Sequence, residues 1–409
     1  MVRRLPGADR ARERGAAVDS ARRWASVVAL AVGIFVLITI EELPIGVLSV
    51  MAPELGVSEG VAGLAVTVPG ILAGVVALCT PVIVRGLDRR LVLVLALASV
   101  VVSCALSVVA QSFTVLLLAR LFAGVSIGLY WAVMAIVAIG QVPREHTARA
   151  LTIAFSGAGG ALVLGVPVAA WIGAHVGWRM AFAVVGALAA VVAVLILLLV
   201  RPVHSPVKVT GRMMLVAARH RGVRYVLALV ALAVVGQFIT YSFISPVLVQ
   251  RAGVPLLDVG VMLLLFGIAG LIGNFAVALL LRRSPPLGVL VVLVGTMVGL
   301  AGVLLIMDGP SRALLVMPVW VLFVGAISVA MQAFVGSEAT EVLEEGTALN
   351  SAAFNASIAV GALVGGLILD AAGQTPMILT SVVMVGAAAL LAMHYLRTAA
   401  PGSERSLSR

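Results

Sequence analysis

The chain has 409 residues, of which 62% are hydrophobic and 11% are charged, and its mean hydropathy is +1.21. Soluble domains are about 45–50% apolar and about 25% charged, so this composition excludes a soluble protein. The formal net charge of +10 does not indicate a nucleic-acid partner, because the basic residues fall in particular loops between apolar runs. We therefore expect a protein of the lipid bilayer.

Apolar runs follow one another along the chain, and each is close to the roughly 20 residues that a helix needs to cross a bilayer. The first run follows a long charged segment without a small-residue cleavage site, so we expect a retained helix rather than a signal peptide. The expected fold is an all-α membrane protein with twelve transmembrane helices in two six-helix bundles. The predicted helices are residues 25–50, 61–84, 91–110, 113–141, 148–173, 178–200, 224–249, 256–281, 287–307, 313–335, 347–371 and 376–396.

A polar, basic segment at 201–223 divides these helices into two groups of six and is typical of a solvated connector with room for a short interfacial helix. The fifth helix of each half carries glycines with the same spacing, Gly165 to Gly177 and Gly361 to Gly373. Such parallel repeats indicate a two-bundle transporter, although small residues also serve close helix packing. The expected regions are a cytoplasmic tail at 1–24, bundles at 25–200 and 224–396, a cytoplasmic linker at 201–223 and a cytoplasmic tail at 397–409.

The basic residues also predict the orientation of the chain. With the first helix running outward, most of the 27 lysines and arginines fall on one side of the membrane. Loops rich in these residues face the cytoplasm, so both termini and the 201–223 segment are predicted to be cytoplasmic.

Two adjacent carboxylates, Glu41 and Glu42, follow the uncharged stretch from Ala25 to Ile40 in the first helix. A charge inside a membrane span costs roughly 2.5–3.5 kcal/mol on insertion scales, so such a residue indicates a functional site. Neighbours on a helix point about 100° apart and cannot share one face. We expect one to line a cavity and exchange a proton; the alternative is that both reach water at the outer surface.

Arg120, in the fourth helix, is the only lysine or arginine in the interior of a predicted span rather than at its end. It lies roughly 12 Å from the outer end of that helix, at a depth similar to that of Glu41. We expect Arg120 to pair with this acid in one conformation and release it in another, which would couple binding to protonation. The alternative is a static structural pair.

A gate is predicted from Asp88, Arg89 and Arg90 after the second helix, and from Gly165 and Pro167 in the fifth. An acid at position 88 can meet a helix N-terminus of the other bundle and hold the inner side closed. Glycines permit close approach, and a proline lets a helix bend. The alternative for Asp88, Arg89 and Arg90 is that the arginines only set the orientation of the chain and Asp88 is their counter-ion. The alternative for the glycine is helix packing alone.

Polar and aromatic side chains in several spans form a predicted substrate wall. Amides and hydroxyls in a membrane helix either hold a substrate or bond across helices, and both alternatives stay open for each residue. As a set they suit an uncharged, hydrogen-bonding solute, because no second intramembrane arginine is available for an anion. The candidates are Tyr130, Trp131, Gln237, Thr240, Tyr241, Ser245, Gln332, Asn350 and Asn355.

Short motifs at 41–46 (EELPIG), 55–60 (LGVSEG), 88–90 (DRR), 120–124 (RLFAG), 128–131 (GLYW), 164–167 (LGVP), 177–179 (GWR), 236–238 (GQF), 241–246 (YSFISP), 353–355 (AFN) and 365–366 (GG) occur in a characteristic order. Over residues 25–395 the chain resembles the major facilitator superfamily, in the bacterial drug–proton antiporter branch that includes sugar, chloramphenicol and purine-ribonucleoside efflux proteins. The resemblance implies that Glu41 is the proton carrier and Glu42 a secondary candidate. It also implies a role for Arg120 in coupling and for Pro167 in antiport.

The chain departs from this family at three places. Val84 replaces the usual glycine before Asp88, the second half keeps Arg282 and Arg283 without an acid, and Gln237 stands where relatives often have histidine. Only the first half can therefore carry the full loop gate.

No phosphate-binding loop of the Gly-x-x-x-x-Gly-Lys type occurs, and five scattered histidines with two apolar cysteines predict neither a metal site nor a nucleophilic triad. We expect a monomeric, multi-pass protein of the bacterial cytoplasmic membrane that is not an enzyme, has no cofactor and draws on the proton gradient. The predicted function is proton-coupled efflux of a small uncharged or weakly charged solute by alternating access. The alternatives are a proton symporter or facilitator for uptake and a non-transporting membrane sensor.

Overall fold

The computed structural model describes residues 6–84, 87–203 and 211–399. Parts of the predicted tails and linker, at 1–5, 204–210 and 400–409, lie outside the described residues. The first half contains α1 (Pro6–Glu54), α2 (Glu59–Ala62), α3 (Leu64–Ile83), α4 (Arg89–Val108), α5 (Phe113–Gly140), η1 (Arg144–His146), α6 (Thr147–Gly160), η2 (Ala161–Gly165), α7 (Val166–His175) and α8 (Trp178–Leu199).

The second half begins with a short helix in the predicted linker, α9 (Gly211–Arg219). It continues with α10 (Arg221–Tyr241), α11 (Ile244–Pro246), η3 (Val247–Arg251), η4 (Leu256–Asp258), α12 (Val259–Leu281), α13 (Pro285–Leu305), α14 (Pro310–Val324), α15 (Ile327–Glu338), η5 (Thr340–Val342), α16 (Leu343–Ala372) and α17 (Gln374–Ala399).

Twelve helical segments within the described residues are long and apolar enough to span a membrane, so the prediction of an all-α protein with twelve spans is confirmed. Prolines lie at two irregular turns inside these spans. Pro167 cannot donate to the carbonyl of Val163, and the π-helical turn η2 covers that carbonyl. Pro246 lies directly before the second π-helical turn, η3. The first turn follows from the missing proline N–H, which breaks the ordinary helical ladder.

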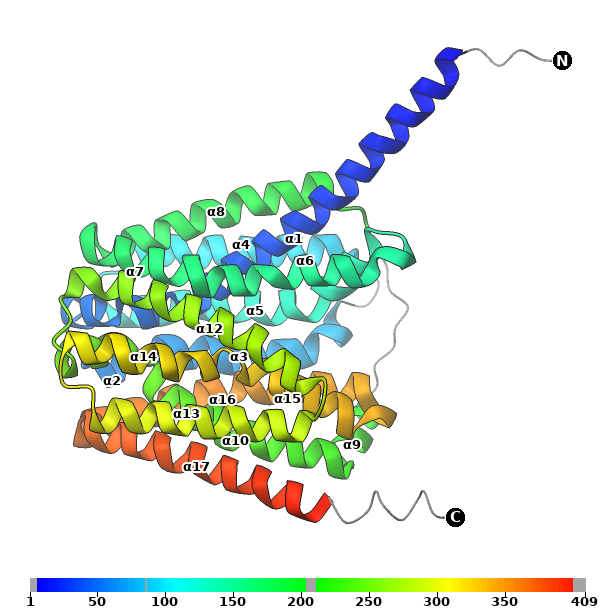
Figure 1. The fold of residues 1–409 in the computed structure, drawn as a ribbon. Coiled ribbons are helices and arrows are strands. Elements are labelled where there is room, and N and C mark those ends of the chain that lie inside the picture. The colour runs from blue at the N-terminus through cyan, green and yellow to red at the C-terminus, as the bar shows by residue number, and fades with distance from the viewer. Residues whose placement is uncertain (1–5, 85–86, 204–210, 400–409) are drawn as a thin grey trace, which may run out of the picture.

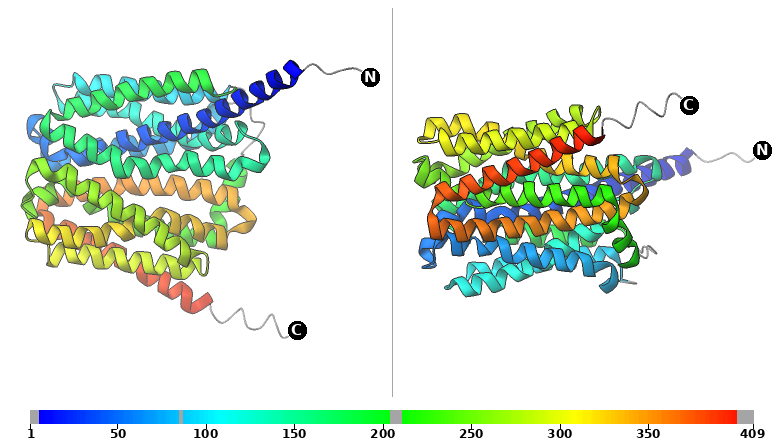
Figure 2. Two further views of the ribbon diagram at one scale, coloured as in Figure 1. Left: turned by 45° about the horizontal axis from the view of Figure 1, so that its top comes forward. Right: turned by 90° about the horizontal axis from the view of Figure 1, so that it is seen from below.

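The spans of each half pack into one bundle, and the two bundles lie side by side with their helices roughly parallel (Figures 1 and 2). The beginning of α1, the end of α17 and α9 lie at one end of the molecule, which we call the terminal end. The α1–α2 turn lies at the opposite, distal end, and the beginning of α1 extends beyond the bundle. Across the boundary between the bundles, α3 packs on α16 and α7 packs on α12.

Small residues bring the two bundles into contact near the distal end. A Cβ atom on Gly60 would lie 2.3 Å from the carbonyl oxygen of Gly366, and one on Gly267 would lie 2.4 Å from that of Leu162. Contact is lost toward the terminal end, because a Cβ on Gly70 would touch Ala359 whereas one on Gly74, a turn later, would meet nothing within 4 Å. Along α3 and α16 the two bundles therefore diverge between Gly70 and Gly74.

Candidate functional site

Side chains at the distal end join the two bundles by hydrogen bonds. The Asp370 carboxylate of α16 accepts from Ser58 Oγ at 2.6 Å and from the Gly60 amide at 3.0 Å. Ser58 is also the N-cap of α2 and accepts from the Val61 amide. We call Ser58, Gly60 and Asp370 the distal clasp. A carboxylate that accepts two hydrogen bonds beside the start of a helix is well suited to hold the bundles together here.

Two further bonds support closure at this end. Gln250 Nε2 donates to Glu59 Oε1 at 2.9 Å, and Ser245 Oγ donates to Ser49 Oγ at 3.0 Å. Ser245 was predicted to contact substrate, but in this conformation its hydroxyl bridges the bundles.

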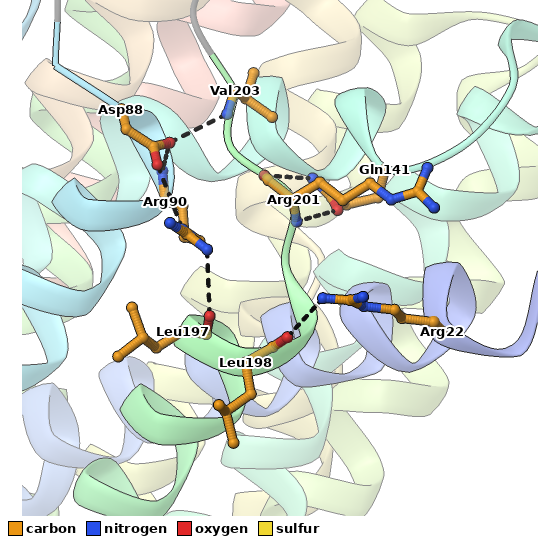
Figure 3. A network of polar contacts seen from close by, with 8 residues as sticks. All are labelled: Arg22, Asp88, Arg90, Gln141, Leu197, Leu198, Arg201 and Val203. Carbon is orange, nitrogen blue, oxygen red and sulfur yellow. Dashed lines mark hydrogen bonds and ion pairs between the residues drawn. The ribbon is translucent and has the colours of Figure 1, made fainter. Parts of the chain in front are cut away.

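Asp88 and its neighbours form a different network at the terminal end (Figure 3). Asp88 caps α4 by accepting from the Arg90 amide, accepts from the Val203 amide at 3.1 Å and pairs with the Arg90 guanidinium. The Arg89 amide donates to the Val203 carbonyl, and its guanidinium donates to Val84. These contacts tie the first half to the segment leading into the linker. The predicted contact between Asp88 and the other bundle is not among them, and its gating role stays a prediction.

The same network anchors the end of α8. Arg22 of α1 donates to the Leu198 carbonyl at 2.9 Å, and Arg90 donates to the Leu197 carbonyl at 3.3 Å (Figure 3). At the end of α5, the side-chain amide of Gln141 donates to the Arg201 carbonyl and accepts from the Arg201 backbone N–H. The chain thus leaves the first bundle in a fixed direction.

Arg120 is fully buried and binds backbone carbonyls rather than a carboxylate. Its Nη1 donates to Ile40 at 2.9 Å, its Nη2 to the Glu41 carbonyl at 3.3 Å and its Nε to Ala65 at 2.8 Å. The Arg120 guanidinium therefore reaches the backbone of Glu41, and no ion pair between their side chains forms among the described residues. The expected Arg120–Glu41 pair is therefore not closed in this conformation.

Two of these carbonyls lack a helical donor because of prolines. In an α-helix the carbonyl of residue i accepts from the N–H of residue i+4. The residue four positions after Ile40 is Pro44, and the residue four positions after Ala65 is Pro69. Because proline has no N–H, each leaves a buried carbonyl unpaired, and Arg120 supplies the missing donors from α5. Arg120 thus joins α1 and α3 at their proline breaks.

Glu41 and Glu42 are both buried in α1, each with 7% of its surface exposed. The backbone carbonyl of Glu41 accepts from Arg120 inside the first bundle. One turn after Glu42, a Cβ on Gly46 would lie 3.6 Å from Leu263 of α12, so Glu42 shares a face of α1 that meets the second bundle. Glu42 Oε2 is buried and has no hydrogen-bond partner. The separate roles expected for the two acids stay a prediction.

Several of the predicted substrate residues instead join helices. Tyr130 is fully buried and donates to the Leu30 carbonyl at 3.0 Å, and the Thr240 hydroxyl lies 2.7 Å from that of Ser381. Trp131 stacks on Phe155. In this conformation the hydroxyl groups of Tyr130 and Thr240 therefore bond across helices, which was one of the two alternatives for these residues.

Another predicted group forms a small network in the second bundle. Gln332 of α15 donates to Thr347 at 2.8 Å and accepts from Asn350 of α16 at 3.0 Å. Asn355 bonds the Ser351 carbonyl of its own helix. The Asn350 Oδ1 atom is buried without a partner.

Gln237 and Tyr241 lie on one face of α10 and meet Trp320 of α14. The Trp320 indole N–H donates to Gln237 Oε1 at 3.1 Å, and the ring of Tyr241 packs edge-on against Trp320 with 6.3 Å between the centroids. Sequence analysis missed Trp320, because a single tryptophan within an apolar run gives no local signal of a polar partner.

A cavity lies between the two halves beside this aromatic pair. Its lining combines residues of α6, η2 and α7 with residues of the second half, and Tyr241 and Asn274 are its polar side chains. The lining residues are Gly159, Leu162, Val166, Tyr241, Ile244, Leu263, Phe266, Gly267, Gly270, Leu271, Asn274, Val321, Val324 and Gly325.

Close packing on α1 explains the glycines of the predicted bend. A Cβ on Gly157 would lie 1.9 Å from the Ala31 carbonyl oxygen, and one on Gly165 would lie 2.0 Å from Thr39 Oγ1. Gly165 ends the π-helical turn η2, and Pro167 lies in the first turn of α7. These residues let the helix approach α1 closely at an irregular turn, which is compatible with packing and with bending.

Comparison with known proteins places this architecture in a family. A sequence profile described as Major Facilitator Superfamily matches residues 30–344. A protein of Salmonella enteritidis PT4 described as purine ribonucleoside efflux pump NepI is 30% identical over 379 residues, covering 90% of this chain and 93% of that protein. Its counterpart in Salmonella typhimurium strain LT2 is 31% identical with the same coverage.

Solved structures share the fold at low sequence identity. A mutant of the nucleoside transporter NupG has a TM-score of 0.73 at 13% identity and covers 91% of this chain and 98% of its own. A bacterial homologue of the lysosomal transporter Spinster, in an inward-facing and unoccupied conformation, has a TM-score of 0.70 at 16% identity and covers 92% and 97%. The chain therefore belongs to the major facilitator superfamily and is a secondary transporter rather than an enzyme.

Proposed function

We propose that this protein exports purine ribonucleosides or closely similar solutes in exchange for protons, by alternating access between its two bundles. The observation that carries the proposal is the buried pair Glu41 and Glu42 in a membrane-spanning helix of a chain 30% identical to a purine ribonucleoside efflux pump. The uncharged, hydrogen-bonding character of a nucleoside fits a cavity whose lining is mainly apolar, includes the Tyr241 hydroxyl and the Asn274 amide, and contains no charged side chain among the described residues.

Orientation and organisation follow from charge and fold. The positive-inside rule supports a cytoplasmic terminal end in the bacterial cytoplasmic membrane, with tails at 1–24 and 397–409 and a linker at 201–223. The clasped distal end then faces outward. The structure would correspond to a state closed to the outside, and a monomer suffices for the cycle, because each chain carries both bundles.

Proton exchange is assigned to Glu41, with Arg120 as the charge beside it. When the distal clasp opens, Glu41 would take a proton from the outside; when the bundles return to the present arrangement, the proton would leave toward the cytoplasm. Arg120 would bind the proline-broken backbone of α1 throughout, so its coupling role depends on the field it exerts on Glu41 rather than on a closed ion pair. Asp88, Arg89 and Arg90 would guard the terminal end.

Solute-dependent proton movement tests the proposal. Purified protein is reconstituted into liposomes containing a pH-sensitive dye, and inosine is then supplied on one side. We expect inosine to move protons in the opposite direction in wild-type vesicles and not in Glu41→Gln vesicles. Inosine transport without any proton movement would favour a facilitator, and parallel movement of the two would favour uptake by symport. Either result would contradict antiport.

A further inference from the structure

The carboxylate of Glu42 is an unused hydrogen-bond acceptor inside the protein. The side chain is 7% exposed, and its Oε2 atom is buried with no partner. Buried polar atoms in folded proteins are almost always hydrogen-bonded. A buried acceptor without a partner therefore indicates that a bound molecule supplies the donor during function. Glu41, its neighbour, has Arg120 of the same bundle nearby, because the Arg120 guanidinium donates to the Glu41 backbone carbonyl.

Gln237, in the other bundle, offers the complementary donor. Its side chain is 1% exposed, and its Oε1 accepts from the Trp320 indole N–H at 3.1 Å. Because an indole N–H can only donate, it must face the oxygen of the Gln237 amide. The NH₂ group of that amide therefore points away from Trp320. That Nε2 atom is buried and has no partner.

Tyr241 adds an aromatic ring beside Gln237. It lies one turn after Gln237 on the same face of α10 and packs edge-on against Trp320. It also lines the cavity between the halves. The Ser49–Ser245 hydrogen bond fixes the register of α1 against the second bundle, and Glu42 lies about two turns before Ser49, just as Gln237 lies about two turns before Ser245. An acceptor from one bundle, a donor from the other and two aromatic rings thus lie at a similar depth along the bundle boundary.

We propose that Glu42 and Gln237 read the hydrogen-bonding edge of a purine base from opposite bundles, with Glu42 accepting from a base N–H and Gln237 donating to the adjacent base acceptor. Tyr241 and Trp320 provide the aromatic surface against which the base packs. This assignment rests on the proposed transport of purine ribonucleosides and gives Glu42 a task separate from proton exchange at Glu41.

The base chemistry fits this pair of groups. Hypoxanthine, the base of inosine, has an N1–H donor next to the O6 acceptor, and adenine has a 6-amino donor next to the N1 acceptor. A site built around such an edge discriminates strongly against an analogue that lacks one group, because a buried partner is then left unpaired. 1-Methylinosine keeps O6 but has no N1–H, and it removes only the donor that Glu42 would accept.

Binding without a proton gradient tests the inference separately from transport. The affinities of inosine and 1-methylinosine are measured by calorimetry on purified wild-type protein, Glu42→Met, Gln237→Glu and the control Thr296→Val. Gln237→Glu keeps the acceptor for Trp320 while removing the donor. Thr296 is a buried hydroxyl on α13 that bonds only the carbonyl of Val292, a residue of its own helix. Thermal unfolding confirms that each variant is folded.

We expect wild type and Thr296→Val to prefer inosine over 1-methylinosine by about 10- to 100-fold, the range for a hydrogen bond to a charged group. Glu42→Met should remove most of that preference. Gln237→Glu should lower the affinity for inosine at least about tenfold. If wild type binds both nucleosides equally, or if Glu42→Met keeps the preference, this inference is overturned while the proposed function stands. If wild type binds neither these nucleosides nor adenosine, the proposed function fails and this inference fails with it. The comparison of the two ligands on wild type remains decisive if a variant does not fold.

Discussion

Arg120 donates a hydrogen bond of 2.9 Å to the carbonyl of Ile40, the group that Pro44 leaves without its helical donor. A second bond, to Ala65, meets the carbonyl that Pro69 leaves free. One buried guanidinium therefore repairs two helix breaks at once. This relationship assigns Arg120 a structural task in addition to the electrostatic one proposed for coupling.

A double-mutant cycle tests this task. Arg120→Ala should lower the free energy of unfolding by several kcal/mol, because each buried carbonyl left unpaired costs about 1–3 kcal/mol. Arg120→Lys should recover little, since an ammonium group cannot reach three carbonyls in the geometry of a planar guanidinium. Pro44→Ala restores an N–H for Ile40, so it should harm the Arg120→Ala background less than wild type, or even stabilise it.

Pro53→Ala is the matched control, because Pro53 also lies in α1. The carbonyl that Pro53 leaves without a helical donor is that of Ser49, which Arg120 does not contact. Thermal unfolding in detergent gives all the values. Strictly additive effects of Pro44→Ala and Arg120→Ala would show that the proline-freed carbonyl is not what Arg120 satisfies.

The glycines of α6 allow a sharp packing test. A Cβ on Gly157 would meet the backbone carbonyl of Ala31 at 1.9 Å, whereas one on Gly159 would meet a flexible Leu271 methyl at 3.5 Å, an ordinary contact. Gly157→Ala should therefore destabilise the protein by about 1–3 kcal/mol through forced movement of α1 against α6. Gly159→Ala should be tolerated. Equal unfolding temperatures for the two variants would refute this description of the α1–α6 contact.

The distal clasp should control access to the cavity from the distal side. Asp370→Ala removes the acceptor for Ser58 Oγ and the Gly60 amide, so it should raise the population open at that end. A cysteine introduced at cavity-lining Leu263, in a background without Cys79 and Cys104, reports this opening as faster reaction with an impermeant maleimide.

Asp308→Ala is the control for this measurement. Asp308 is also an acid at the distal end, but it pairs with Arg312 of its own half. Its replacement should leave labelling at position 263 unchanged. If Asp370→Ala also leaves labelling unchanged, the clasp does not hold the distal side closed.

Much of the fold could be predicted because hydrophobicity is a local property. Each span needs about 20 apolar residues in succession, and the predicted runs coincide with the candidate spans to within a few residues at most ends, for example 113–141 against Phe113–Gly140. The largest difference within the described residues is at the end of the seventh span, predicted as 224–249 but found as Arg221–Tyr241, because α10 ends before the short helix α11 and the π-helical turn η3.

The site was harder to predict, because its contacts join residues far apart in sequence. Arg120 was recognised as a cation within a predicted span, but its partners are carbonyls that carry no side-chain signal. The position of Pro44 and Pro69, four residues after Ile40 and Ala65, could have identified those carbonyls. Thr240 and Ser245 were predicted to contact substrate together with Tyr241 only because all three carry a hydroxyl group. The structure shows hydroxyl pairs with Ser381 and Ser49 that no local pattern reveals.

The central claim is that a proton on Glu41 drives net movement of the solute. Its most direct test compares two assays on the same liposomes: exchange of labelled for unlabelled inosine, and net inosine transport driven by a pH gradient. We predict that wild type performs both, whereas Glu41→Gln keeps the exchange and loses the gradient-driven transport. Full gradient-driven transport by folded Glu41→Gln protein would contradict the account.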